Sequence, residues 1–188
     1  MYLGDSLRVA AQRPDYMGWI FSPRSARRVS ADAARLQIHE IRLKYPEIRH
    51  VGVFAFNPAV EVRQIWSRVG LLDYLQIADG AGYQDALCRM AGFRRELLWP
   101  VLRVRRPVAL ADQLRFCGSP MLLVDAYDPV RPGGTGRQVP TEFLGEMRRP
   151  FLLAGGLRPE NVASALQATA AIGADVASGV EVPGQPGR

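Results

Sequence analysis

The chain has 188 residues, of which 48% are hydrophobic and 22% charged, and its formal net charge is +6. This length predicts one domain over residues 1–188 with a sizeable core, and no apolar run is long enough to cross a membrane. The basic residues are scattered and accompany no nucleic-acid-binding motif, so an anionic small molecule or a solvated surface accounts for them better than nucleic acid.

The two cysteines, Cys88 and Cys117, have neither the spacing of a metal site nor that of a disulfide framework. The N-terminus lacks the basic and apolar regions of a secretory signal. We therefore expect a cytoplasmic protein with reduced thiols. No residue pattern indicates a metal ion or another cofactor.

Apolar runs of strand length alternate with helical patterns along the whole chain. Strands are expected at residues 16–21, 51–56, 74–78, 97–104, 121–127, 151–154 and 174–180. Helices are expected at residues 6–12, 30–45, 57–70, 85–90, 107–116, 140–147 and 159–170, with Ser30 as an N-terminal cap.

This alternation is typical of βαβ units and of a parallel sheet. The strands are almost continuously apolar, which fits a sheet that is covered on both faces. About seven strands are predicted, whereas a closed (β/α) barrel has eight. An open doubly wound sheet is the alternative, and the number of strands alone does not exclude it.

The fifth expected strand ends in an acid, and a glycine-rich loop follows it. Side chains alternate along a strand, so Leu123, Asp125 and Tyr127 share one face. An acid at the carboxyl end of a strand in such a chain is typical of a catalytic group. Initiation of a turn is an equally good explanation for one aspartate.

Two further strands end in small residues, Gly155-Gly156 and Ser178-Gly179. Backbone amides of such loops, together with a helix that begins near Pro159, form the type of phosphate site found after the last strands of barrels. Tight turns explain either pair alone. The occurrence of both pairs in succession favours phosphate binding.

Five motifs occur in an order and spacing that resemble those of the phosphoribosylanthranilate isomerase family. They are Gly18-Trp19-Ile20-Phe21-Ser22-Pro23-Arg24-Ser25-Ala26-Arg27, Val51-Gly52-Val53-Phe54, residues 122–127 with 133–136, residues 153–162, and residues 175–181 with Pro183-Gly184. The resemblance implies a (β/α)8 TIM-barrel type of fold. It also implies the Amadori rearrangement of N-(5-phosphoribosyl)anthranilate to 1-(o-carboxyphenylamino)-1-deoxyribulose 5-phosphate in tryptophan biosynthesis.

The resemblance also implies roles for individual residues. Arg27 would hold the anthranilate carboxylate, and a guanidinium group suits that geometry. Asp125 would be the general acid that protonates the ribose ring oxygen. Gly134 would lie in a mobile loop over the site, and Gly155, Gly156, Ser178 and Gly179 would bind the substrate phosphate.

The chain also departs from the family pattern. The family begins with a strand of the type Lys-Ile-Cys-Gly-Ile-Thr, whose cysteine is the general base, and it ends with a helix after Pro183-Gly184. Neither segment is present here, and neither cysteine is expected at the end of a strand. The family histidine of Gln-Leu-His-Gly is replaced by Ala78, and a family serine by Ala177.

The sequence therefore predicts an α/β barrel that lacks the first strand and the last helix. The resemblance implies that it acts on a small phosphoribosyl substrate, and we expect a monomer or homodimer without nucleic-acid or membrane partners. The alternative is a truncated form or an impaired paralogue that only binds phosphorylated sugars. A third possibility is an interaction module that obtains its missing strand from a partner, because open sheet edges pair readily.

Overall fold

The computed structural model describes residues 3–126 and 138–182. Seven parallel strands form one sheet, in which each strand pairs with the next one along the chain. The strands are β1 (Tyr16–Ile20), β2 (Arg49–Phe54), β3 (Tyr74–Ile77), β4 (Leu98–Val104), β5 (Leu122–Ala126), β6 (Phe151–Leu153) and β7 (Gly173–Ala174).

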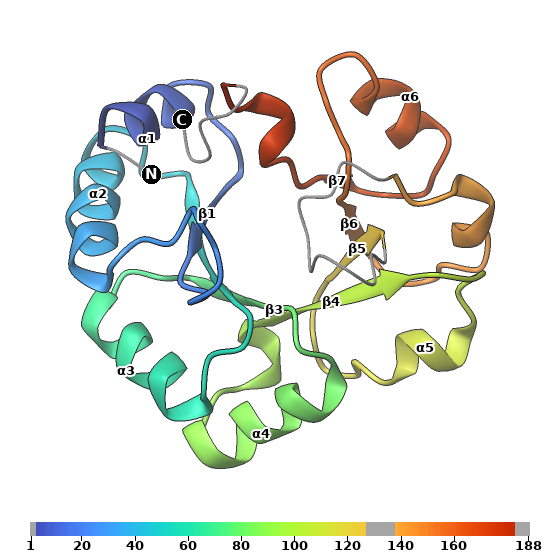
Figure 1. The fold of residues 1–188 in the computed structure, drawn as a ribbon, viewed down its shortest axis with the longest axis horizontal. Coiled ribbons are helices and arrows are strands. Elements are labelled where there is room, and N and C mark those ends of the chain that lie inside the picture. Colours follow the sequence, from blue (N-terminus) through green and yellow to red (C-terminus); the bar gives the residue numbers. More distant parts are fainter. Residues whose placement is uncertain (1–2, 127–137, 183–188) are drawn as a thin grey trace.

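Helices surround this sheet on its outer side (Figure 1). They are α1 (Leu3–Ala10), α2 (Ala31–Lys44), α3 (Ala59–Val69), α4 (Ala81–Ala91), α5 (Leu110–Leu114) and α6 (Val162–Gln167), and the 3-10 turns are η1 (Arg95–Leu97), η2 (Thr141–Leu144) and η3 (Ser178–Val180). No helix in the described ranges is long and apolar enough to span a bilayer.

The order of the strands decides between the two architectures that the sequence left open. A doubly wound sheet reverses its strand order at a switch point, whereas here the order runs from β1 to β7 without reversal. The sheet curls around a common axis as in a barrel (Figure 1). Within the described residues no strand joins β7 to β1, so the expected incomplete barrel of seven strands is confirmed.

The core has two layers because side chains alternate across each strand. An outer layer lies between the strands and the helices and includes Trp19, Phe54, Leu122 and Val124. An inner layer fills the barrel axis, with Val51, Trp99, Val101, Met121 and Leu123. The expected face that carries Leu123 is therefore the inner face, while Tyr127 lies outside the described residues.

Several expected element boundaries are wrong near the C-terminus. The strand expected at residues 174–180 is only Gly173–Ala174, and the chain then forms a loop and η3. The helices expected at residues 107–116 and 159–170 shorten to α5 and α6. By contrast, the expected cap of α2 is confirmed, because the Ser30 hydroxyl accepts a hydrogen bond from the Ala33 amide at 3.2 Å.

A buried histidine lies in the outer layer near the beginning of β2. The indole of Trp19 donates to Nδ1 of His50 at 3.1 Å, so the ring proton lies on Nε2, which has no partner in the described part of the chain. Burial lowers the pKa of His50 to about 4; the charge of Arg42 adds to this effect and that of Asp73 opposes it. The folded state therefore favours the neutral form of this imidazole over the charged form.

This histidine should make the protein sensitive to acid. Its pKa is about 4 in the folded state and about 6.5 in an unfolded chain. The stabilisation is complete above pH 6.5 and is lost as the pH falls towards 4, up to roughly 3 kcal/mol. Melting curves of wild type and His50→Gln between pH 7.5 and 4.5 should show a smaller loss of stability in the variant. The control His39→Gln changes an exposed residue of α2 and should behave like wild type; equal pH dependence in all three proteins would contradict this assignment.

Candidate active site

Four residues form a row at the carboxyl ends of neighbouring strands. Arg103 on β4 is in register with Asp125 on β5. The register from Val124 through Leu153 to Ala174 places Asp125, Ala154 and Asp175 at the next level. Hydrogen bonds of 2.8 Å from the Ala154 and Asp175 amides to the Val124 and Leu153 carbonyls continue the same ladder.

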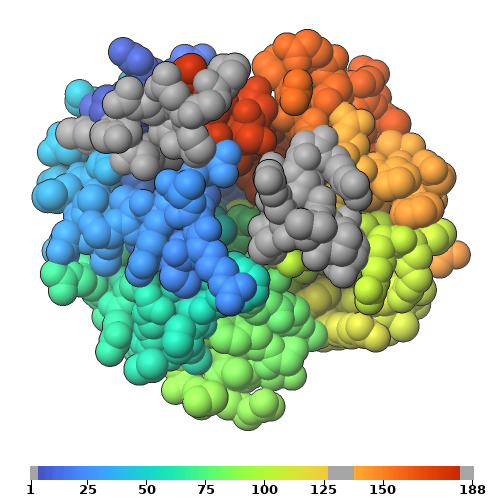
Figure 2. Space-filling view, in the orientation of Figure 1, coloured from blue at the N-terminus to red at the C-terminus, as the bar shows by residue number. Residues whose placement is uncertain are grey.

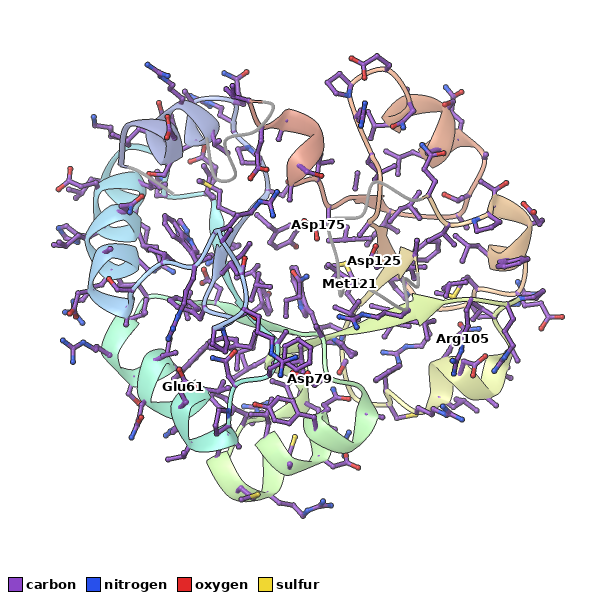
Figure 3. The ribbon with its side chains drawn as sticks, viewed as in Figure 1. Glu61, Asp79, Arg105, Met121, Asp125 and Asp175 are labelled. Carbon is purple, nitrogen blue, oxygen red and sulfur yellow. The ribbon has the colours of Figure 1, made fainter. Side chains whose placement is uncertain are left out.

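This row lies on the inner face of the barrel. Val101 and Leu123 belong to the inner layer, and Leu152 packs against it; Arg103, Asp125 and Ala154 are each two residues further along the same strands. Figure 3 shows Asp125 and Asp175 on the inner side of the sheet, near one another. Both aspartates are partly buried and keep some solvent access.

Burial acts on both aspartates, and a neighbouring like charge adds to it at Asp175. Burial raises the pKa of Asp125, while the Ala126 backbone amide and the Arg103 guanidinium oppose that shift. Burial also raises the pKa of Asp175 to about 6, and the negative charge of Asp125 adds to the effect. Two carboxylates in such surroundings resist full ionisation, so the site retains a proton closer to neutral pH than ordinary aspartates do.

Arg103 provides the positive charge of this row. Its Nε is buried and has no hydrogen-bond partner among the described residues. Arg103 is also one of the residues around a cavity of about 210 Å³, together with Ala78, Gly80 and Arg115. Arg103 could not be singled out from the sequence, because its inward direction follows only from the register of β4.

The two glycine loops contact one another directly. Gly155 and Gly156 have φ values of 88° and 62°, which L-residues rarely adopt. At Gly179 an added Cβ would lie 1.9 Å from the carbonyl oxygen of Leu157, so only glycine fits there. The structure therefore brings the loops after β6 and β7 together, as the phosphate hypothesis requires, although tight turns are also part of the explanation.

The helix that was expected to point at these loops is shorter than predicted. Asn161 accepts a hydrogen bond from the Arg158 amide at 2.8 Å and donates one to the Gly156 carbonyl at 3.0 Å. This side chain holds residues 156–161 as a turn, and α6 begins only at Val162. The Arg158 amide is consequently engaged within the protein and does not point freely at a ligand.

Arg27 belongs to the loop after β1, and Figure 2 shows this part of the chain, in blue, on the face turned to the viewer. Its guanidinium makes two hydrogen bonds of 2.6 Å to the carboxylate of Glu181, beyond η3. The bonds to Glu181 raise the pKa of Arg27 further. This ion pair connects the segments that follow β1 and β7, the two strands at the open seam of the barrel.

The remaining expectations concern the loop glycine Gly134, the two cysteines and metal binding. Gly134, with the rest of its loop, lies outside the described residues. Cys88 lies in α4, Cys117 follows α5, and both are free thiols. Neither lies at the carboxyl end of a strand, as the sequence predicted. In the described ranges, no group of three or more His, Cys, Asp or Glu side chains is arranged to hold a metal ion.

The chain is similar to proteins of one family over nearly its full length. The family described as N-(5'phosphoribosyl)anthranilate (PRA) isomerase matches residues 4–186. The N-(5'-phosphoribosyl)anthranilate isomerase of Chlorobaculum tepidum is 34% identical, with 94% of this chain and 81% of that protein covered. The enzyme of Stenotrophomonas maltophilia is 36% identical, with coverage of 92% and 76%.

Solved structures show the same relationship. Phosphoribosyl anthranilate isomerase from Thermotoga maritima superposes with a TM-score of 0.81 at 27% identity, covering all of this chain and 88% of that one. A phosphoribosyl anthranilate isomerase in complex with reduced 1-(o-carboxyphenylamino)-1-deoxyribulose 5-phosphate gives a TM-score of 0.71 at 28% identity, with coverage of 100% and 87%. The shared fold, the family match and the identities together establish that this chain belongs to the N-(5'-phosphoribosyl)anthranilate isomerase family.

Proposed function

We propose that the protein catalyses the family reaction, the rearrangement of N-(5'-phosphoribosyl)anthranilate to 1-(o-carboxyphenylamino)-1-deoxyribulose 5-phosphate in tryptophan biosynthesis. The observation that carries this proposal is the placement of Asp125, at the carboxyl end of β5 and on the inner face of the sheet. Barrel enzymes place their catalytic groups at this end, and the family match covers the whole site.

The phosphate group of the substrate would bind between the loops that follow β6 and β7. Gly155 and Gly156 leave their backbone open to close approach, and Ser178 with Gly179 faces the same place because Gly179 packs on Leu157. Backbone amides are the usual ligands of phosphate at such turns. Because Asn161 occupies the Arg158 amide, the glycine loops contribute more than α6 does.

The anthranilate carboxylate would bind at Arg27, in the loop between β1 and α2. Glu181 occupies two of the three guanidinium nitrogens, so the substrate carboxylate either uses the remaining nitrogen or displaces Glu181. The guanidinium carries five N–H donors in a planar arrangement. Arg27 can therefore bind a second carboxylate while it still holds the first on one side.

Asp125 would act as the general acid. Its raised pKa increases the fraction of the carboxyl form that can donate a proton to the ribose ring oxygen. Proton donation by a positioned carboxyl group typically accelerates such a step on the order of 10²–10⁴-fold. The reaction also needs a base, and neither the cysteines nor the histidines of this chain lie at the row.

A second candidate function is the binding of phosphorylated sugars without their conversion, which needs only the two glycine loops that Gly179 and Leu157 bring into contact. The oligomeric state is a monomer or a homodimer; a dimeric phosphoribosylanthranilate isomerase of Thermotoga maritima is among the similar structures. The proposed location is the cytoplasm, where the free thiols Cys88 and Cys117 would stay reduced.

The phosphate site can be tested at Gly179. Gly179→Ala would place a methyl group against the Leu157 carbonyl and separate the two loops. Titration calorimetry with ribose 5-phosphate should show binding to wild type and a loss of about tenfold or more in the variant, the worth of one hydrogen bond to a charged group. Gly82→Ala is the matched control, since its Cβ would meet no atom within 4 Å. No heat at millimolar ligand from folded wild-type protein would refute the phosphate site.

The carboxylate site can be tested at Arg27. Arg27→Ala should weaken binding of reduced 1-(o-carboxyphenylamino)-1-deoxyribulose 5-phosphate by about 1.5–3 kcal/mol, because a hydrogen bond to a charged group is lost. Binding of ribose 5-phosphate, which has no carboxylate, should stay nearly unchanged. Arg24→Ala removes an exposed arginine of the same loop and should affect neither ligand. Equal losses for both ligands in Arg27→Ala would show that Arg27 has a different role.

A further inference from the structure

We propose that Phe56 determines specificity for the aryl group of the substrate, because its ring stacks on the anthranilate ring. This inference rests on the proposed function and adds to it a residue that recognises the aromatic part of the substrate. Phe56 follows β2 at its carboxyl end, which is the end of the barrel where the catalytic row lies. Three features carry the inference: the backbone of Phe56, the hydrogen bonds around it and the exposure of its ring.

The backbone of Phe56 has a conformation that bulky residues rarely adopt. Its φ is 63°, in the left-handed region, where the Cβ atom of an L-residue is crowded. Such conformations persist only where the surroundings hold them, and they are concentrated at ligand sites. Glycine or asparagine fits a turn of this kind more easily, so the turn alone does not account for an aromatic side chain.

Hydrogen bonds from neighbouring loops hold this turn in place. The Phe56 amide donates to the carboxylate of Asp79 at 2.9 Å, and Asp79 lies between β3 and α4 (Figure 3). The Ser22 hydroxyl donates to the Ala55 carbonyl at 2.9 Å. The buried Asn57 side chain accepts a hydrogen bond from the Ala55 amide at 3.3 Å. The loops after β1 and β3 therefore fix the point from which the Phe56 side chain projects.

The ring of Phe56 keeps part of its surface open. Arg24, from the loop after β1, lies over the ring with its Cζ atom 4.2 Å from the ring centroid. Phe56 is nevertheless 41% exposed, so the opposite face and the edge of the ring are left for a ligand. Aromatic rings pair favourably through an offset face or an edge. A fixed and exposed ring at this end of the barrel is therefore suited to bind another planar ring.

The place of Phe56 fits the aryl end of the substrate. β1 and β2 are paired neighbours, and Arg24 and Arg27 belong to one loop, so Phe56 lies beside the loop that would hold the substrate carboxylate. In anthranilate this carboxylate is bonded directly to the ring. The phosphate loops lie across the barrel, because β2 and β6 are four strands apart in the sheet order, which is half of an eight-strand barrel (Figure 1). A substrate that extends from those loops to Arg27 therefore places its ring next to Phe56.

The test separates the ring of Phe56 from its backbone. Asparagine adopts the left-handed conformation more readily than most residues, so Phe56→Asn removes the ring and keeps the turn, whereas Phe56→Tyr keeps the ring. Met90→Asn is the control, because it introduces asparagine at an exposed apolar residue of α4. Binding of reduced 1-(o-carboxyphenylamino)-1-deoxyribulose 5-phosphate and of ribose 5-phosphate is measured by calorimetry at several temperatures, and melting curves report the stability of each protein.

We expect wild type to bind the aryl analogue more tightly than ribose 5-phosphate. Phe56→Asn should weaken analogue binding about tenfold, because the stacked pair and its buried apolar surface are lost, and should leave ribose 5-phosphate binding nearly unchanged. The negative heat-capacity change of analogue binding should become smaller in magnitude. This variant should melt at the wild-type temperature or above it, because the strain is relieved. Phe56→Tyr and Met90→Asn should bind both ligands within about threefold of wild type.

Two outcomes would overturn the assignment of Phe56 and leave the proposed function standing. One is a Phe56→Asn protein that keeps the wild-type affinity for the analogue. The other is an equal loss for both ligands in this variant, which would show that Phe56 supports the site as a whole and not the aryl group. A wild type that binds neither compound would reject the proposed function and this inference together.

Discussion

The register between the parallel strands β4 to β7 is the constraint on which the site depends. Side chains alternate along a strand, so a slip of one residue would move every inward side chain to the outer layer. The apolar contacts on both faces prevent such a slip, because Leu123 packs in the inner layer while Leu122 and Val124 pack under the helices. The same packing therefore fixes the fold and directs Arg103, Asp125 and Asp175 into the barrel.

This placement has an energetic cost that the rest of the fold offsets. Two carboxyl groups are held in surroundings that oppose their ionisation, and raised pKa values of this kind are typical of acid–base sites. The ion pair between Arg27 and Glu181 holds another part of the fold together, because it connects the segments after β1 and β7. It lies across the seam where the described sheet has two unpaired edges.

The sequence predicted the regular part of the fold well, because apolar runs, prolines and caps are local signals. The six strands β1 to β6 lie close to the expected ranges, and Ser30 caps α2 as expected. The C-terminal elements were harder to predict, because their ends depend on contacts between residues of different turns. Asn161 bonds to Gly156, and Gly179 packs on Leu157. Contacts of this kind leave no periodic pattern, so α6 and β7 were predicted too long.

The site was predictable only in part. Asp125, Arg27 and the glycine pairs stood in motifs, and the structure places those that it describes at one end of the sheet. Asp175 stood in a motif as well, but its proximity to Asp125 depends on strands that are about fifty residues apart in the chain. The strand predicted at residues 174–180 put Asp175 near its beginning, and only the observed end of β7 at Ala174 places this acid at a carboxyl end. Arg103 required the register itself.

The central claim is that Asp125 and Asp175 share one charged environment inside the barrel. Carbon-13 NMR of labelled aspartate carboxyl groups, with the Asp175 signal assigned through Asp175→Asn, measures this directly. We predict that the Asp175 carboxyl titrates near pH 6 in wild type. In Asp125→Asn its pKa should fall, because the repulsion is removed while burial remains. An Asp175 pKa that is ordinary in wild type, or that Asp125→Asn leaves unchanged, would contradict the account.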